Sequence, residues 1–273
     1  MIHLKSEREI ERLRASADLV GRTLAAVASQ VAPGVTTAEL DRIAETFIRD
    51  HQAEPAFKGY RVGNEIFPAT LCTSIDDEVV HGIPNDQPLQ DGSIVSVDCG
   101  VLLDGYYGDS AYTFAVGTQS KENRLLMTTT YEALMLGMDQ ATTGKRVGDI
   151  GAVIQLHCEG RGFGVVKDLV GHGIGRDLHE DPQIPNYGRA GSGRKLKTGL
   201  TICIEPMINR GSAGVRTEGD GWTVKTADSL TSAHYEHTVV VRPGEAEVLT
   251  TFRYIEEVLK ELPYKHIAEV VYG

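Results

Sequence analysis

Acidic residues stand inside apolar β-strand patterns, and this feature constrains the fold of the chain more than any other. Residues 93–103 alternate in the manner of a half-buried strand, and Asp98 lies in the middle of that pattern. Asp104-Gly105 is a strong signal for a two-residue hairpin turn, and residues 106–116 form the returning strand. The sequence therefore predicts an antiparallel hairpin that carries a charged group among apolar neighbours.

The register of this hairpin predicts a pair of carboxylates. With Asp104-Gly105 as the turn, Asp98 faces Ala111 and Gly100 faces Asp109, so both aspartates lie diagonally on one face. A solvated face is the ordinary explanation for polar residues in an antiparallel sheet. Asp98 argues against it, because an unpaired charge among apolar residues is unfavourable.

Two further acids repeat the pattern. Glu205 ends the apolar run that starts at Ile202, and Glu236 lies shortly before the apolar run 239–241. Pro206 favours an extended backbone at Glu205, and His172 lies in the string Gly-His-Gly-Ile-Gly. Four carboxylates and one imidazole suit a pair of divalent ions of the Mn, Fe, Co or Zn type, and four positive charges balance four acids.

Helical patterns flank the strands. Ser6 to Glu9 has the spacing of a capping box, Pro33-Gly34 breaks the helix that follows, and Thr36 to Glu39 begins a second helix. Residues 121–140 and 147–158 repeat this helix pair about 110 residues later. We expect an α+β fold with a mainly antiparallel curved sheet, covered by two pseudo-twofold-related helix pairs.

Composition excludes several functional classes. The net charge of −11 argues against a nucleic-acid binder and a peripheral membrane protein, because both need a basic face. No apolar run approaches the roughly 18 residues of a membrane span, and the charged start is unlike a signal peptide. Four well-separated cysteines favour reduced thiols over disulfides or a zinc ribbon. We expect a cytoplasmic protein.

At this point the chain resembles the type I methionine aminopeptidases, metallopeptidases of family M24 with the pita-bread fold. The resemblance covers most of residues 1–250 and rests on short strings such as Val-Val-His-Gly-Ile-Pro at 79–84 and Ile-Glu-Pro-Met at 204–207. It also rests on five residues in the order of the family's ligands: Asp98, Asp109, His172, Glu205 and Glu236. We expect residues 1–250 to form a single catalytic domain, and residues 251–273 an extension with a short helix packed on that domain.

The resemblance implies a two-metal centre. Asp98, Asp109 and Glu236 would hold one divalent ion, and Asp109, His172, Glu205 and Glu236 would hold the other. A water or hydroxide between the ions would be the nucleophile, because the ions lower its pKa toward neutrality. Co, Mn, Fe and Zn all suit these ligands, and metal availability decides between them.

The resemblance also implies catalytic and substrate-binding residues. Glu205 would carry a proton to the leaving amine, His179 would stabilise the developing oxyanion, and His81 would bind the amide beyond the scissile bond. Taken alone, either histidine is more often a structural loop residue. The pocket for methionine would be lined by Tyr60, Phe67, Cys72, His81, Leu178 and Trp222.

The implied function is removal of the initiator methionine from nascent polypeptides, with a preference for a small second residue. The protein would act as a monomer with transient ribosome contact, for which Arg189, Arg194, Lys195 and Lys197 form a local basic run. Three features depart from the family pattern. The loop 60–68 is longer by about four residues, His234 stands where many members have glutamine, and residues 251–273 extend past the usual end.

Two other functions stay open. Prolidases and proline aminopeptidases share the five ligands, but the 80 residues before His81 leave no room for their additional N-terminal domain. A metal-free binding protein of the same fold would lack one or more of the ligand residues, whereas this chain has all five.

Overall fold

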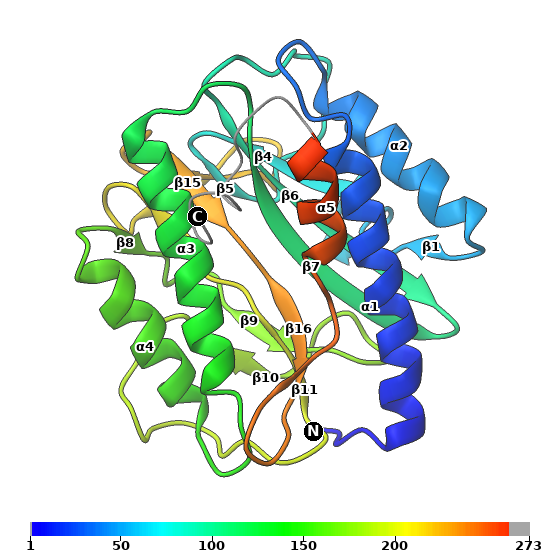
Figure 1. Ribbon diagram of the computed structural model, residues 1–273, viewed down its shortest axis with the longest axis vertical. Coiled ribbons are helices and arrows are strands. Elements are labelled where there is room, and N and C mark those ends of the chain that lie inside the picture. The colour runs from blue at the N-terminus through cyan, green and yellow to red at the C-terminus, as the bar shows by residue number, and fades with distance from the viewer. Residues whose placement is uncertain (1, 262–273) are drawn as a thin grey trace.

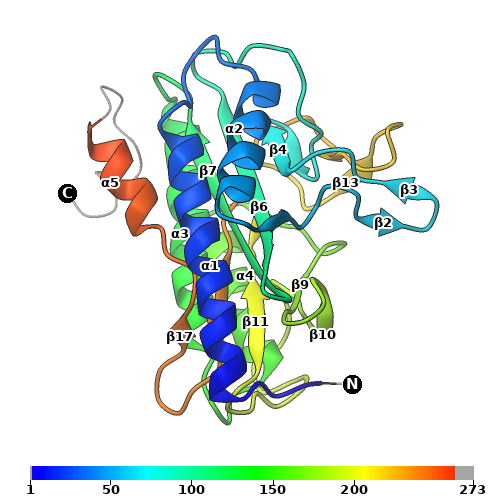
Figure 2. The same ribbon diagram turned by 90° about the vertical axis from the view of Figure 1, so that its right-hand side faces the viewer.

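A computed structural model describes residues 2–261, with helices on one side of a set of strands (Figure 1, Figure 2). α1 (Glu7–Ala28) and α2 (Thr37–Asp50) cover one half of the strands, and α3 (Lys121–Asp139) and α4 (Val147–Glu159) cover the other half (Figure 1). All pairs of named strands in the described residues are antiparallel. The predicted α+β class with two helix pairs is therefore confirmed.

The strands form two larger sheets and three small ones. In the first sheet, β6 (Ile94–Leu103) pairs with β1 (Glu54–Pro55), β4 (Leu71–Ile75) and β7 (Tyr106–Ala115). The second has the order β10 (Glu180–Ile184), β9 (Gly171–Gly173), β11 (Thr201–Ile204), β16 (His237–Val240), β17 (Glu247–Val248). One small sheet has the order β15 (Ser232–His234), β12 (Met207–Asn209), β8 (Gly164–Val165). Another has the order β13 (Val215–Thr217), β14 (Val224–Thr226), β5 (Glu78–Val80). The third is the pair of β2 (Arg61–Val62) and β3 (Glu65–Ile66).

Local sequence determines where the first two helices begin. The Ser6 N–H donates to Glu9 Oε2 at 2.9 Å, and the Thr36 N–H donates to Glu39 Oε2 at 3.1 Å. The Glu39 N–H donates back to the Thr36 hydroxyl at 3.2 Å. The bond at Ser6 belongs to the predicted capping box, and the bonds at Thr36 form a second capping box at the predicted start of the second helix. Gly34 separates the two helices at φ +91°, a conformation that glycine adopts without strain.

The β6–β7 hairpin has the predicted register. Asp104 and Gly105 form its turn with φ values of 51° and 77°, which match the twist of the flanking strands. Gly100 pairs with Asp109 across the ladder, and Asp98 lies two residues before Gly100 on the same face. The diagonal placement of the two aspartates is confirmed.

The later strands differ from the prediction at one point. The sequence predicts strands over 200–205 and 235–241, whereas the structure bends both segments at Glu205 and Glu236. On one side of the bends β11 pairs with β16, and on the other side β12 pairs with β15 in a different sheet. The Glu236 N–H donates to Ala111 O at 2.9 Å, outside either of these ladders. Pairing to two sheets thus places both glutamates at one junction.

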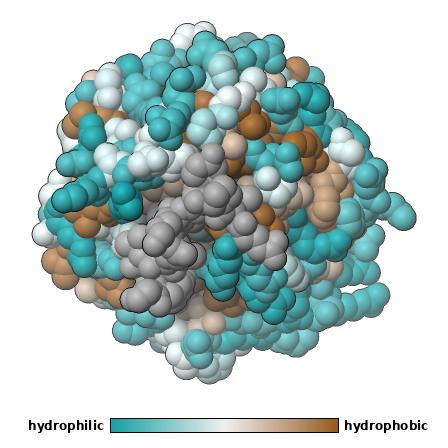
Figure 3. All heavy atoms as spheres, turned by 45° about the horizontal axis from the view of Figure 1, so that its top comes forward, coloured by the Kyte–Doolittle hydropathy of each residue, from teal (hydrophilic) through white to brown (hydrophobic). Residues whose placement is uncertain are grey.

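The main apolar core lies between the helices and the strands. Leu24, Val97, Leu134 and Ile204 are among its fully buried members. The face in Figure 3 is mostly hydrophilic, with apolar residues in separate small groups. Among the described residues, every helix is too short or too polar to cross a bilayer.

α5 (Arg253–Glu261) packs on the outer side of α1 (Figure 2). Phe252, Ile255 and Leu259 are buried in this contact region, and the Tyr254 hydroxyl donates to Asp18 Oδ1 at 2.7 Å. The rest of the expected extension, residues 262–273, lies outside the described part of the chain. We infer that α5 braces the rest of the fold.

Shortening one buried side chain of α5 tests this inference. Ile255→Val is expected to lower the free energy of unfolding by about 0.5–1.5 kcal/mol, because it removes a methylene from a packed site. Glu257→Ala, on the exposed side of the same helix, should change it by less than about 0.5 kcal/mol. Urea unfolding measures both variants, and equal effects would contradict the brace.

Candidate metal centre and substrate pocket

Four carboxylates converge where the two larger sheets meet. Asp98 comes from β6, Asp109 from β7, and Glu205 and Glu236 from the two bends. One oxygen each of Asp98, Asp109 and Glu236 lies within 4.8 Å of the others. Asp98 Oδ1, Asp109 Oδ1 and Glu236 Oε1 are buried and have no hydrogen-bond partner in the described part of the chain. Orphaned buried oxygens of this kind require a proton or a cation.

His172, on β9, completes the group. Its Nε2 lies 3.5 Å from Glu205 Oε1 and 4.0 Å from Asp109 Oδ2. Its Nδ1 lies 2.9 Å from Gly173 O, and donation to this carbonyl leaves the Nε2 lone pair directed at the acids. A Cβ on Gly171 would approach a backbone oxygen of β11 at 2.4 Å, so β9 needs a glycine there to lie this close.

Burial determines which of these groups are charged. Burial raises the pKa of Asp98 to about 7. Burial, with repulsion from the other carboxylates, also raises the pKa values of Asp109, Glu205 and Glu236. Burial lowers the pKa of His172 to about 3, so its imidazole is neutral. Neutral imidazole is the form that binds metals, and cations at this site would replace the protons of the acids.

The donor set fits divalent metal ions. Carboxylate oxygens and imidazole nitrogens are ligands for Mn, Fe, Co and Zn ions. Three of the acids form one possible ligand group, and His172, Cys203 and Glu236 form another. The structure brings all five predicted ligand residues together, and it adds Cys203, which the sequence analysis did not assign to the site.

The five residues line one part of a cavity of about 300 Å³. All six predicted pocket residues line it: Tyr60, Phe67, Cys72, His81, Leu178 and Trp222. The rings of Phe67 and Trp222 meet edge to face at 5.2 Å. Further residues that the sequence did not indicate also line the cavity: Phe57, Val62, Val80, Leu169, Val170 and the buried Met207.

The loop 60–68 keeps Tyr60 and Phe67 at the cavity. The Phe67 N–H donates to Tyr60 O, and the Gly59 N–H donates to Phe67 O, both at 2.9 Å. These bonds close the base of the β2–β3 hairpin, which projects from the body (Figure 2). Val62 lines the cavity from this hairpin although it is 58% exposed.

Two further histidines line the cavity. His179 Nδ1 lies 2.6 Å from the Tyr60 hydroxyl, and the His179 and His172 rings meet edge to face at 4.4 Å. His81 has a φ of 60°, a left-handed conformation that is uncommon outside glycine. Burial lowers the pKa of His81 to about 4 and also lowers that of His179, so both are neutral.

The histidines of the last strands have other surroundings. His237 Nδ1 lies 2.7 Å from the Thr250 hydroxyl, and its ring stacks on Phe252 at 3.9 Å, so it supports the fold away from the carboxylates. The backbone N–H of His234 donates to the Thr113 hydroxyl at 3.0 Å, while its Nε2 is buried without a partner among the described residues.

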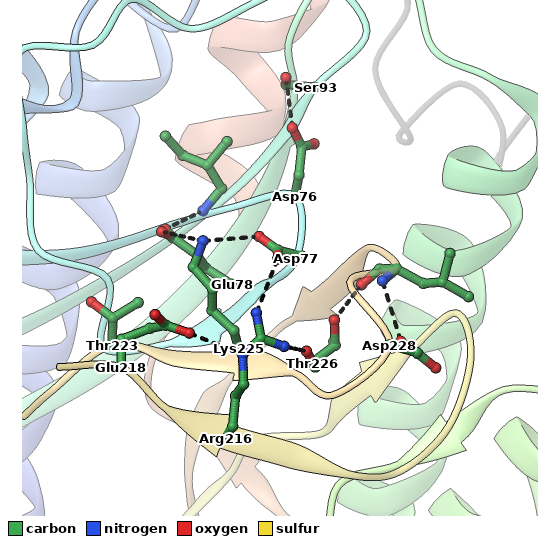
Figure 4. A network of polar contacts seen from close by, with 12 residues as sticks. Asp76, Asp77, Glu78, Ser93, Arg216, Glu218, Thr223, Lys225, Thr226 and Asp228 are labelled. Carbon is green, nitrogen blue, oxygen red and sulfur yellow. Dashed lines mark hydrogen bonds and ion pairs between the residues drawn. The ribbon is translucent and has the colours of Figure 1, made fainter.

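A polar network fixes two sides of the cavity relative to each other (Figure 4). Lys225 lies on β14. Its Nζ is 3.2 Å from Oδ1 of Asp77, which precedes β5, and 3.6 Å from Oε1 of Glu78, the first residue of β5. His81 follows β5 and Trp222 precedes β14. These ion pairs therefore hold the segment that carries His81 against the segment that carries Trp222.

Known proteins match the chain over most of its length. The sequence model of metallopeptidase family M24 matches residues 11–243. A methionine aminopeptidase of Clostridium perfringens is 49% identical over 253 residues, which are 93% of this chain and 100% of the relative. The crystal structure of methionine aminopeptidase from Thermotoga maritima is similar with a TM-score of 0.89 at 39% identity, over 92% of this chain and 100% of that one.

The prolidase from Pyrococcus horikoshii shares the fold, with a TM-score of 0.73 at 20% identity, but this chain covers only 63% of it. Both the higher identity and the complete coverage therefore distinguish the methionine aminopeptidases from the prolidase as relatives. The chain has the pita-bread fold and belongs to metallopeptidase family M24, among its methionine aminopeptidases.

Proposed function

We propose that this protein is a metal-dependent aminopeptidase that removes the initiator methionine from nascent polypeptides. The observation that carries this function is the convergence of four buried carboxylates and a neutral imidazole beside a largely apolar cavity. A metal-free binding protein has no need for four buried carboxylates, which are unfavourable without cations. The same observation thus favours the enzyme over that alternative.

We assign the ligands as two overlapping sets. Asp98, Asp109 and Glu236 would hold one divalent ion, and Asp109, His172, Glu205 and Glu236 would hold a second. When bound there, divalent ions would supply a Lewis acid for the scissile carbonyl and would lower the pKa of a water toward neutrality. Asp98, Asp109 and Glu236 each have a buried oxygen without a hydrogen-bond partner among residues 2–261, which supports this assignment.

The remaining steps use side chains of the protein. Glu205, at the bend beside His172, accepts a proton on its carboxylate and passes it to the leaving amine. Donation from the Tyr60 hydroxyl to His179 Nδ1 leaves a hydrogen on Nε2, which stabilises the developing oxyanion. His81 binds the amide beyond the scissile bond. The apolar cavity holds the methionine side chain between Phe67, Cys72 and Trp222.

The Tyr60 hydroxyl offers a test of the proposed tautomer. Tyr60→Phe keeps the ring in the cavity wall but removes the hydrogen bond to His179, so we expect kcat to fall by about 2- to 10-fold with little change in KM. Tyr254→Phe is the matched control, because it loses one hydrogen bond far from the cavity. Steady-state kinetics should show unchanged kcat for the control. An equal loss in both variants would contradict the assigned role.

The proposed function is tested with peptides and defined metals. Protein stripped of metal should release methionine from Met-Ala-Ser only after Co²⁺, Mn²⁺, Fe²⁺ or Zn²⁺ is added. A larger second residue crowds the scissile bond, so kcat/KM for Met-Leu-Ser should be lower by about 10- to 200-fold. Absence of methionine release with every ion would exclude the enzyme. Faster cleavage of Xaa-Pro dipeptides would favour the prolidase alternative.

Cellular context follows from the substrate. Nascent chains emerge in the cytoplasm, and we propose that the protein acts there as a monomer with transient ribosome contact. The exposed basic residues Arg189, Arg194, Lys195 and Lys197 lie in one loop segment and suit an RNA-rich surface. Ribosome pelleting at increasing salt tests the contact. Neutralising two of these residues should weaken pelleting, and no pelleting at low salt would exclude it.

A further inference from the structure

The thiol of Cys203 faces the metal centre. Cys203 lies in β11, and Glu205 comes directly after the last residue of that strand. Ile202 and Ile204 belong to the main core, so strand alternation turns the Cys203 side chain to the opposite face, toward the metal centre. Cys203 is fully buried, and its Sγ lies 3.4 Å from the hydroxyl of Thr238, its partner in the β11–β16 ladder. This strand therefore presents a sulfur atom, and the bend that follows it presents a carboxylate.

Three different donor atoms meet at this point. A ring nitrogen of His172, the Sγ of Cys203 and a carboxylate oxygen of Glu236 all lie within 4.8 Å of one another. His172 comes from β9, which pairs with β11, and Glu236 precedes β16, which pairs with the opposite edge of β11. Adjacent strands of one sheet thus hold the three donors close together.

The free donor atoms of His172 and Glu236 suit a common ligand with the thiol of Cys203, which lies beside them. Glu236 Oε1 is buried and has no hydrogen-bond partner in the described part of the chain. The Gly173 carbonyl occupies Nδ1 of His172, which leaves Nε2 available. Zinc–sulfur and zinc–nitrogen bonds are about 2.3 and 2.0 Å long, so shifts of about 1 Å would bring all three donors to one tetrahedral ion.

We propose that the metal centre binds a thiophilic divalent ion, such as Cd²⁺ or Zn²⁺, through His172, Cys203 and Glu236. This inference rests on the proposed metal centre and adds a sulfur ligand to it. Thiolate selects soft ions, whereas carboxylates suit harder ions such as Mn²⁺. Coordination forms a metal–sulfur bond and releases the thiol proton to solvent. The thiol thus adds affinity for soft ions and none for Mn²⁺.

Cadmium binding provides the test. Metal-stripped protein is titrated with Cd²⁺ while calorimetry measures affinity and ultraviolet difference spectra record the sulfur-to-cadmium charge-transfer band. We expect the band in the wild type. Cys203→Ser should lose the band and bind Cd²⁺ about 10- to 100-fold more weakly, with unchanged affinity for Mn²⁺. Circular dichroism confirms folding, and Cys203→Ala serves as a second variant that lacks the thiol.

Two other cysteines provide matched controls. Cys158 is buried in α4 within the main core, and Cys72 lines the cavity near Asp98, its neighbour in the β4–β6 ladder. Cys158→Ser and Cys72→Ser should both keep the band. Cadmium binding without a band, or a band that survives in Cys203→Ser, would overturn the sulfur ligand while leaving the metal centre intact. Failure of the wild type to bind any divalent ion would overturn the metal centre itself.

Discussion

Replacing Glu205 with glutamine is expected to lower kcat by about 10²- to 10⁴-fold, the usual contribution of a general acid–base. A glutamine amide has nearly the shape of the carboxylate but carries no proton to the leaving amine. The backbone carbonyl of Glu205 accepts a hydrogen bond from Asn186 Nδ2 at 2.9 Å, and the variant retains this bond. The bend should therefore persist while proton transfer is lost.

The measurement must separate proton transfer from metal binding, because Glu205 is also a proposed ligand. Methionine release from Met-Ala-Ser is measured at saturating metal, so that weaker binding does not lower kcat. Thermal unfolding and metal content are compared with the wild type. Glu159→Gln, at the end of α4, is the control for the substitution itself and should keep full activity. Wild-type turnover in Glu205→Gln would refute the assigned role.

Part of this site could be predicted because its geometry is local. The Asp104-Gly105 turn and the strand alternation determine the register of β6 and β7, and that register places Asp98 and Asp109 on one face. The capping boxes at the starts of α1 and α2 are equally local. Such features need only neighbouring residues, so the sequence contains all the information that they require.

Other parts depend on contacts between distant segments. The bends at Glu205 and Glu236 arise because each of these two segments pairs with strands of two different sheets. No short stretch of sequence predicts such pairing. The cavity wall combines Val62 with residues near 169 and 207, which only the folded chain brings together. Cys203 was within reach of prediction, since its position two residues before Glu205 predicts the same face of the strand.

Metal removal should make the stability of the protein strongly dependent on pH. Burial raises the pKa of Asp98 from 3.8 to about 7 and raises those of Asp109, Glu205 and Glu236. The folded metal-free protein then binds more protons than the unfolded chain, so its free energy of unfolding falls as pH rises through about 7. Buried histidines oppose this trend only below about pH 6.5, where unfolded histidine becomes charged.

We therefore expect the metal-free protein to be less stable at pH 8.5, above the raised pKa of Asp98, than at pH 6.5, below it. At pH 8.5, a divalent ion at a thousandfold excess over its dissociation constant should restore about 4 kcal/mol. The same concentration of ion at pH 6.5 should restore less, because protons then compete with the ion for the acids. Urea unfolding with chelator and with Mn²⁺, at both pH values, measures these changes. Asp98→Asn removes one of the repelling carboxylates, so its metal-free form should be more stable than the wild type at pH 8.5 yet gain less from Mn²⁺. Equal metal-free stability at both pH values would contradict the repulsion between buried acids on which the proposed centre depends.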